Sequence, residues 1–194
     1  ERCRAILKEE LDAPPSTDVE RLYRRILRGD KLAAPAPVMP GHNLPAAQTS
    51  FVGREPELRQ IAAMLSDPAC RLISVVGPGG CGKSRLALQA ASRAMRSFAD
   101  GACYVPLEAC SSINYLVNAI AKALEFSIDG YASDLDPKTQ LLDYLRGRSI
   151  LLLMDGFEHL VEGAGLLSEI LEAAPKARLI VTSRQRLGLH GEWI

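Results

Sequence analysis

The chain has 194 residues, 47% of them hydrophobic, and its 23 basic and 23 acidic side chains leave no formal net charge. This length suits one α/β domain with a short additional segment. The balanced charge argues against a basic surface for nucleic acid or for a membrane, and no apolar run is long enough to span a bilayer. Five scattered cysteines form no C-x-x-C pair, which favours a reducing, cytoplasmic location over a disulfide framework or a zinc site.

Residues 1–30 have the pattern of two short amphipathic helices, the second opening with a capping box at Thr17–Glu20 and closing at Gly29. Two such helices cannot form a core alone, and the pattern begins mid-helix without a methionine, so we interpret the chain as part of a longer protein. Residues 31–48 are rich in proline and alanine, as in an extended linker. We expect the main domain over residues 49–194.

This third region alternates between strand and helix patterns, which predicts a parallel α/β sheet. The expected strands are 72–76, 102–107, 150–154 and 178–182. The expected helices are 55–66, 83–97, 112–125, 136–146 and 159–174.

Residues 77–84 read Gly-Pro-Gly-Gly-Cys-Gly-Lys-Ser, the pattern G-x-x-x-x-G-K-[ST] between an expected strand and helix. Glycines let backbone N–H groups surround a phosphate, and the helix N-terminus adds further donors. We expect Lys83 to reach the β- and γ-phosphates and the Ser84 hydroxyl to bind Mg²⁺. The residues expected to hold ATP or ADP at this loop are Gly77, Pro78, Gly79, Gly80, Cys81, Gly82, Lys83, Ser84 and Arg85.

Asp155 follows the apolar strand 150–154, where a carboxylate can share the Mg²⁺ with Ser84. Taken alone, an aspartate in this position is equally typical of a helix N-cap; beside the loop, the metal role is favoured. Arg184 lies just after the strand 178–182 and could sense the γ-phosphate, although it could also be a surface arginine.

Hydrolysis is less well supported than binding. Many strand-end acid motifs carry a second acid directly after the first, to orient water, and here that position is Gly156. Either Glu158 substitutes for it, or turnover is slow and the protein works by holding nucleotide. The candidate catalytic residues are Lys83, Asp155, Glu158 and Arg184.

Phe51–Glu55, the loop, Met154–Leu160 and Thr182–Arg184 occur in an order that resembles the nucleotide-binding domain of signal-transduction ATPases with numerous domains, the STAND class that includes NB-ARC proteins. More narrowly, the chain is similar to bacterial transcriptional regulators that contain this domain. The resemblance implies a three-layer P-loop NTPase sandwich with sheet order 2-3-4-1-5, its last strand truncated. It also implies that Val52, Gly53 and Arg54 lie beside the base and ribose. Residues 1–30 resemble the last helices of a bacterial transcriptional activator domain, an α-helical segment.

The resemblance implies a Mg-ATP/ADP-binding switch in a cytoplasmic transcriptional regulator, with slow or regulated ATP hydrolysis. Its expected partners are nucleotide and other domains of the same protein, with DNA reached only through domains outside this chain and possible self-assembly when ATP is bound. One alternative is a P-loop kinase that phosphorylates a small molecule, although no lid or acceptor motif is visible. Another is a nucleotide-binding scaffold that does not hydrolyse.

Overall fold

The computed structural model of the chain describes residues 41–46, 49–108, 110, 115–128 and 135–194. The two helices expected within residues 1–30 and the first part of the expected linker lie outside the described residues. The domain boundaries given above therefore stay predictions.

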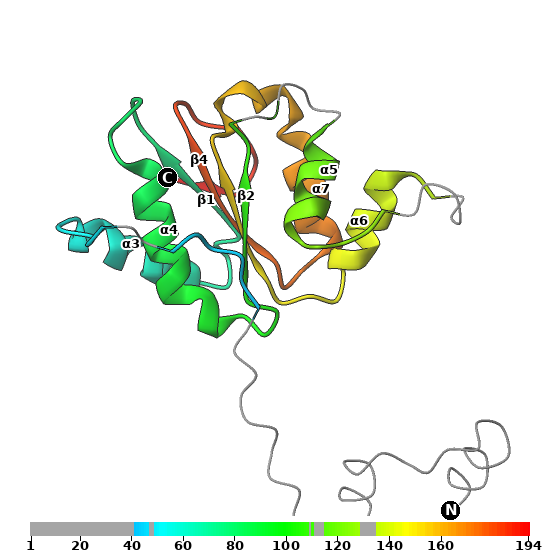
Figure 1. Cartoon of the computed structure of the whole chain (residues 1–194), viewed down its shortest axis with the longest axis horizontal. Coiled ribbons are helices and arrows are strands. Elements are labelled where there is room, and N and C mark those ends of the chain that lie inside the picture. Colours follow the sequence, from blue (N-terminus) through cyan, green and yellow to red (C-terminus); the bar gives the residue numbers. More distant parts are fainter. Residues whose placement is uncertain (1–40, 47–48, 109, 111–114, 129–134) are drawn as a thin grey trace, which may run out of the picture. The chain divides into compact units, whose positions relative to one another are not determined.

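A parallel sheet of five strands forms the centre of the described domain (Figure 1). The order across the sheet is β2-β3-β4-β1-β5, which confirms the expected order 2-3-4-1-5. The four longer strands match the sequence prediction to within one residue at each end, and the fifth has only two residues. The strands are β1 (Leu72–Val76), β2 (Ala102–Pro106), β3 (Leu151–Asp155), β4 (Arg178–Ser183) and β5 (Glu192–Trp193).

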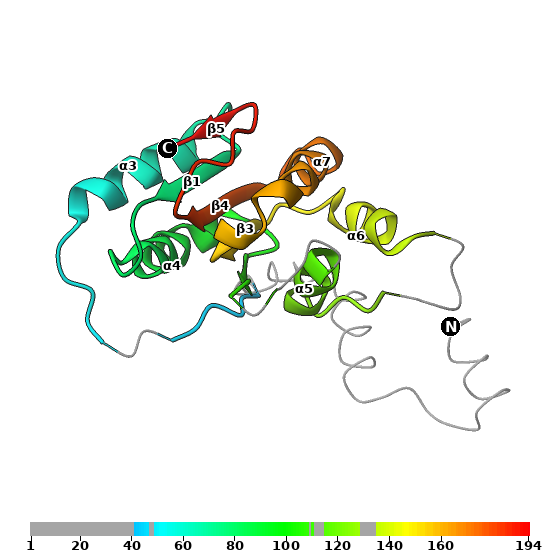
Figure 2. The same ribbon diagram turned by 90° about the horizontal axis from the view of Figure 1, so that it is seen from above.

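Helices cover both faces of the sheet and complete three layers (Figures 1 and 2). Helices α3 (Glu55–Ser66) and α4 (Lys83–Ala94) lie on one face, and the short 3₁₀ turn η1 (Met95–Ser97) extends α4. Helices α5 (Leu116–Ala123), α6 (Pro137–Leu145) and α7 (Gly165–Ala173) lie on the other face. The predicted α/β sandwich is confirmed.

The helix expected over residues 159–174 is wrong in its first turns. Two 3₁₀ turns, η3 (Phe157–His159) and η4 (Val161–Gly163), precede α7. Gly156 leaves β3 with a φ of 85°, and Leu160 between the two turns has non-helical angles, so a continuous helix cannot start there. As a result, Glu158 stays close to the end of β3.

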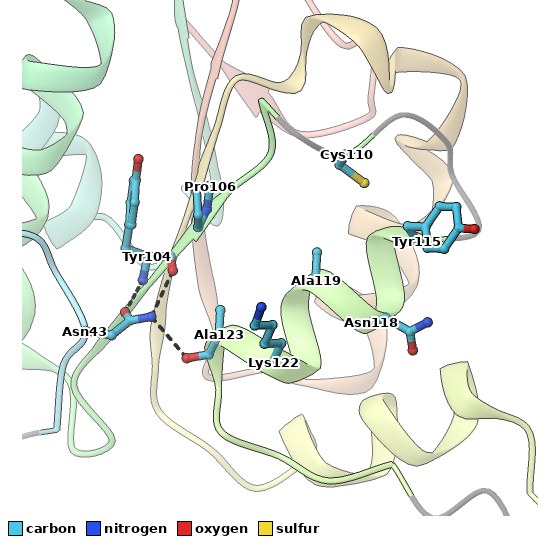
Figure 3. Close-up of a pocket in the computed structure, with 9 residues that line it drawn as sticks. All are labelled: Asn43, Tyr104, Pro106, Cys110, Tyr115, Asn118, Ala119, Lys122 and Ala123. Atoms are coloured by element: carbon cyan, nitrogen blue, oxygen red, sulfur yellow. Dashed lines mark hydrogen bonds between the residues drawn. The ribbon is translucent and has the colours of Figure 1, made fainter.

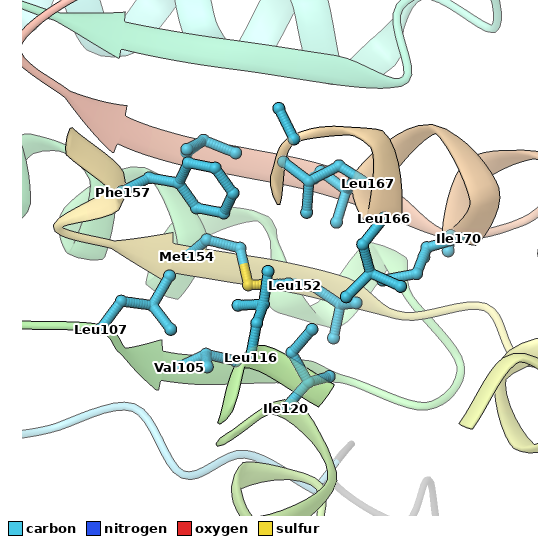
Figure 4. Close-up of a cluster of buried hydrophobic side chains, with 14 of the residues drawn as sticks. Val105, Leu107, Leu116, Ile120, Leu152, Met154, Phe157, Leu166, Leu167 and Ile170 are labelled. Atoms are coloured by element: carbon cyan, nitrogen blue, oxygen red, sulfur yellow. The ribbon is translucent and has the colours of Figure 1, made fainter. Parts of the chain in front are cut away.

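Side chains of the central strands alternate between two cores. Leu152 and Met154 of β3 pack against α5 and α7 on one face (Figure 4), while Leu151 and Leu153 pack toward α3 and α4 on the other. All four are completely buried. Burial on both faces explains why the sequence of β3 is an unbroken apolar run, as is usual for a central parallel strand. The two cores fix the strand ends that carry the candidate site.

Candidate functional site

The loop of residues 77–82 connects the carboxyl end of β1 to the N-terminus of α4. Gly80 and Gly82 have φ angles of 74° and 88°, a left-handed conformation that costs glycine little and other residues much more. Gly82 is the N-cap of α4, and Lys83 is its first residue. The backbone donors of this helix end therefore face the loop, as an anion site requires.

Gly77 and Cys81 approach each other closely within the loop. A Cβ atom placed on Gly77 would lie 2.9 Å from Cys81 Sγ, closer than such atoms approach in proteins. The Cys81 side chain therefore folds back over Gly77. This contact gives Cys81 a packing role that the sequence pattern did not reveal.

Lys83 is 9% exposed, and its ammonium group is held by the loop itself. Its Nζ atom donates to the carbonyl oxygens of Gly77 at 2.9 Å and Pro78 at 3.0 Å. A buried ammonium needs such partners, since an unpaired charge in a protein interior is costly. The lysine is thus positioned over the loop at the point where the sequence predicts phosphate.

The segment before α3 contacts the loop through two arginines. Arg54, in a left-handed conformation with φ 57°, donates from Nη2 to the Cys81 carbonyl oxygen. Arg85 donates to Thr49 Oγ1 at 2.9 Å and lies over the Phe51 ring. These contacts bring the predicted 52–54 segment beside the loop, although the Val52 side chain itself is 85% exposed and points to solvent.

Asp155 ends β3 and is 4% exposed. Its Oδ1 atom accepts a hydrogen bond of 2.6 Å from the Thr182 hydroxyl, and its Oδ2 atom accepts one of 3.1 Å from the Tyr104 hydroxyl. Thr182 Oγ1 in turn accepts from Gly156 N at 2.9 Å. Hydroxyls from β2 and β4 therefore fix the orientation of this carboxylate, which ends the strand between them.

The environment of Asp155 also affects Tyr104. Burial, the Asp155 charge and the hydrogen bond to Asp155 raise the pKa of Tyr104 to about 12, and the charge of Glu108 contributes further. Each of these effects favours the neutral phenol. Tyr104 therefore remains a hydrogen-bond donor to Asp155 across the physiological pH range.

Arg184 follows β4 and lies next to the loop. Its guanidinium is 3.6 Å from the position that a Cβ on Gly79 would take, and its Nε is 3.3 Å from Glu158 Oε1. The arginine side chain is 64% exposed and that of Glu158 is 19% exposed. Two of the predicted catalytic residues thus form an ion pair beside the glycine loop.

A separate cavity of about 630 Å³ lies between β2 and α5, lined in part by Asn43 and Lys122 (Figure 3). None of the loop residues 77–84 lines it. At the edge of β2, the Asn43 side chain accepts a hydrogen bond from the Tyr104 N–H and donates one to the Tyr104 carbonyl oxygen. We therefore place the candidate site at the loop and not in this cavity.

Two features of the site were missed from the sequence: the hydroxyl partners of Asp155 and the proximity of Glu108 to Gly156. A Cβ on Gly156 would lie 3.3 Å from Glu108 Cγ. The available signal was the sheet order, because Tyr104, Asp155 and Thr182 lie on three adjacent strands.

Among the described residues, no group of three His, Cys, Asp or Glu side chains forms a metal cluster. No helix in the described part of the chain has the length and apolarity to cross a bilayer.

A parallel sheet whose first strand leads through a glycine loop and a lysine into a helix defines the class of P-loop nucleoside triphosphatase domains. The chain belongs to the AAA ATPase domain family, whose model matches residues 50–182.

The chain is also similar to individual proteins and to solved structures. The chain is 30% identical to the regulatory protein AfsR of Streptomyces griseus, over 95% of this chain and 20% of AfsR. It is 32% identical to protein Rv0894 of Mycobacterium tuberculosis, over 74% of this chain and 36% of that protein. The crystal structure of Cdc6p from Pyrobaculum aerophilum has the same fold, with a TM-score of 0.51 and 14% identity over 73% of this chain and 41% of that one. The chain thus spans about a third or less of the length of AfsR or Rv0894.

Proposed function

We propose that the loop of residues 77–84 binds ATP and ADP. The observation that carries this proposal is the convergence of Lys83, Asp155 and Arg184 at the carboxyl edge of neighbouring parallel strands, where ligands bind in such sheets. Lys83 is already held over the loop by two carbonyl oxygens, and the α4 N-terminus supplies backbone donors. Membership in the AAA ATPase domain family supports the same ligand.

The residues present also fit a magnesium ion. Mg²⁺ in nucleotide sites uses one or two protein oxygens together with phosphate oxygens and water. Ser84 in the first turn of α4 would supply a hydroxyl and Asp155 a carboxylate that Thr182 and Tyr104 keep oriented. The metal would neutralise phosphate charge there. The Tyr104 and Thr182 hydroxyls each donate one hydrogen bond to the Asp155 carboxylate. The other lone pairs of this carboxylate would bind the Mg²⁺ ion.

We further propose that the domain is a STAND-type switch. Arg184 next to Gly79 would distinguish ATP from ADP, because its guanidinium can donate to a γ-phosphate that ADP lacks. Arg54 and its neighbours Val52 and Gly53 would lie beside the base and ribose, a role supported by the contact of Arg54 with Cys81. Slow or regulated hydrolysis of ATP would reset the switch.

The regulatory setting is also a proposal. AfsR of Streptomyces griseus is a regulatory protein, and the match extends over 95% of this chain. We propose that this domain controls other domains of a longer transcriptional regulator, that DNA is reached through those domains, and that ATP binding promotes self-assembly.

Calorimetric titration with ATP and ADP in the presence of Mg²⁺ tests the proposal. Lys83→Ala removes a charge-assisted contact of about 1.5–3 kcal/mol, so we expect at least a tenfold loss of affinity. Lys176→Ala, which alters an exposed lysine next to β4, is the matched control and should bind as the wild type does. Equal affinity in the wild type and Lys83→Ala would refute nucleotide binding at this loop.

A further inference from the structure

The backbone pairing of β2 and β3 continues one residue past the end of β2. Pro106 pairs with Asp155, and Leu107 N then donates to the Asp155 carbonyl oxygen at 2.8 Å. Glu108 follows Leu107 and lies beside Gly156, where a Cβ atom would be 3.9 Å from Glu108 Cα.

The stem of Glu108 takes the space in which a side chain at position 156 would begin. A Cβ on Gly156 would lie 3.3 Å from Glu108 Cγ and 3.5 Å from Glu108 N, and Gly156 has a φ of 85°. A side chain at position 156 would therefore be both crowded and strained. Glycine at this position leaves room for the Glu108 side chain beside the residue that follows Asp155.

The electrostatics of the site agree with this placement. The charge of Glu108 acts on the Tyr104 phenol, the same group that donates to Asp155 Oδ2. The two carboxylates thus come from neighbouring strands at one edge of the sheet and share a neighbour. Glu108 is solvent-exposed, whereas the Glu158 side chain is paired with Arg184 and partly buried.

We propose that Glu108 is the carboxylate that orients and deprotonates the attacking water during ATP hydrolysis at this site. The inference rests on the proposed function. In the step, the water oxygen forms a bond to the γ-phosphorus, and the bond from that phosphorus to the β–γ bridging oxygen breaks. ADP leaves with the electron pair, and the water proton passes to the Glu108 carboxylate. The second acid of the site is therefore supplied by β2 and not by the residue after Asp155.

The test compares purified Glu108→Gln with the wild type and with Glu172→Gln, an exposed glutamate on α7 that serves as the matched control. A general base contributes about 10²–10⁴-fold, so we expect Glu108→Gln to hydrolyse ATP at least 100-fold more slowly. Its ATP affinity by calorimetry should stay within about threefold of the wild type. A second readout is the nucleotide retained after incubation with Mg-ATP and desalting, identified by chromatography: ADP in the wild type, ATP in Glu108→Gln.

The outcomes separate this inference from the proposed function. Wild-type turnover by Glu108→Gln, or no hydrolysis by the wild type despite tight ATP binding, would overturn the role of Glu108 alone. Loss of hydrolysis in Glu158→Gln with normal turnover in Glu108→Gln would assign the role to Glu158. Absence of nucleotide binding by the wild type would overturn both proposals. Thermal unfolding of each variant shows whether it is folded, and the isosteric change at an exposed position should preserve the fold.

Discussion

The hydroxyl of Thr182 is the central polar group of the site, and its removal should destabilise the domain. Thr182 is 1% exposed and donates to Asp155 Oδ1 at 2.6 Å while it accepts from Gly156 N at 2.9 Å. Thr182→Val keeps the shape of the side chain and removes both bonds. A hydrogen bond to a charged group contributes about 1.5–3 kcal/mol, and an unsatisfied buried donor costs about 1–3 kcal/mol.

The two effects predict a loss of roughly 2–4 kcal/mol in the free energy of unfolding, because Gly156 is only partly buried and water can satisfy part of the lost bonding. For a domain of this size, the midpoint of thermal unfolding should fall by roughly 5–15 °C. Urea unfolding without nucleotide measures the change directly. Thr182→Ser keeps the hydroxyl and loses one methyl group, so it should cost only about 1 kcal/mol. Equal stabilities of the valine and serine variants would refute the reasoning.

Two further changes probe the surroundings of Asp155. The pKa of Tyr104 is about 12 in the folded protein, above its usual value of 10, so its contribution to stability is complete below pH 10 and is lost as the pH rises toward 12. The absorbance difference at 295 nm between wild type and Tyr104→Phe should show a phenol titrating near 12, and a midpoint near 10 would contradict the structure. Gly156→Ala should lower the free energy of unfolding by about 1–2 kcal/mol through its positive φ, with a further loss from contact with Glu108. Gly188→Ala, where φ is 71° and a Cβ meets nothing within 4 Å, is the control with the same backbone strain, and equal costs at both glycines would count against the crowding.

The sequence predicts the fold well because buried parallel strands leave strong signals. The unbroken apolar run of β3 and the short run of β1 identify central strands, and the glycine loop marks the candidate nucleotide site between β1 and α4. The resemblance supplies the strand order, which the structure confirms. The error at residues 159–164 arises because apolar spacing there also suits a helix, whereas the backbone at Gly156 and Leu160 interrupts it.

The partners of the site residues could not be predicted in the same way. Tyr104 lies 51 residues from Asp155 and Thr182 lies 27 residues from it, so no local pattern connects them. Only the sheet register brings them together. The same limit applies to Glu108, which sequence spacing does not connect to Gly156. Side-chain partners across strands are a consequence of tertiary pairing, and a single sequence carries that information weakly.

The pairing of Arg184 with Glu158 leads to a prediction about nucleotide preference. We take contact with a γ-phosphate to replace the ion pair of Arg184 with Glu158, in which Nε and Oε1 are 3.3 Å apart. Since the arginine side chain is 64% exposed, this pair contributes no more than about 1 kcal/mol. A charge-assisted bond to phosphate contributes about 1.5–3 kcal/mol, so the net gain for ATP over ADP is roughly 1–2 kcal/mol.

Arg184→Ala should therefore reduce the preference for ATP over ADP by roughly 5- to 30-fold. ADP offers Arg184 no γ-phosphate, so the variant should keep its ADP affinity. Calorimetric titration of both nucleotides with Mg²⁺ measures the ratio, and Arg186→Ala, two residues along and also exposed, provides a control with the same change of charge. A parallel loss of ATP and ADP affinity in Arg184→Ala would show that the arginine holds the loop near Gly79 and does not sense the γ-phosphate. Because the same change also frees Glu158, an increase in ATP hydrolysis by Arg184→Ala would in addition indicate that the ion pair restrains a second carboxylate.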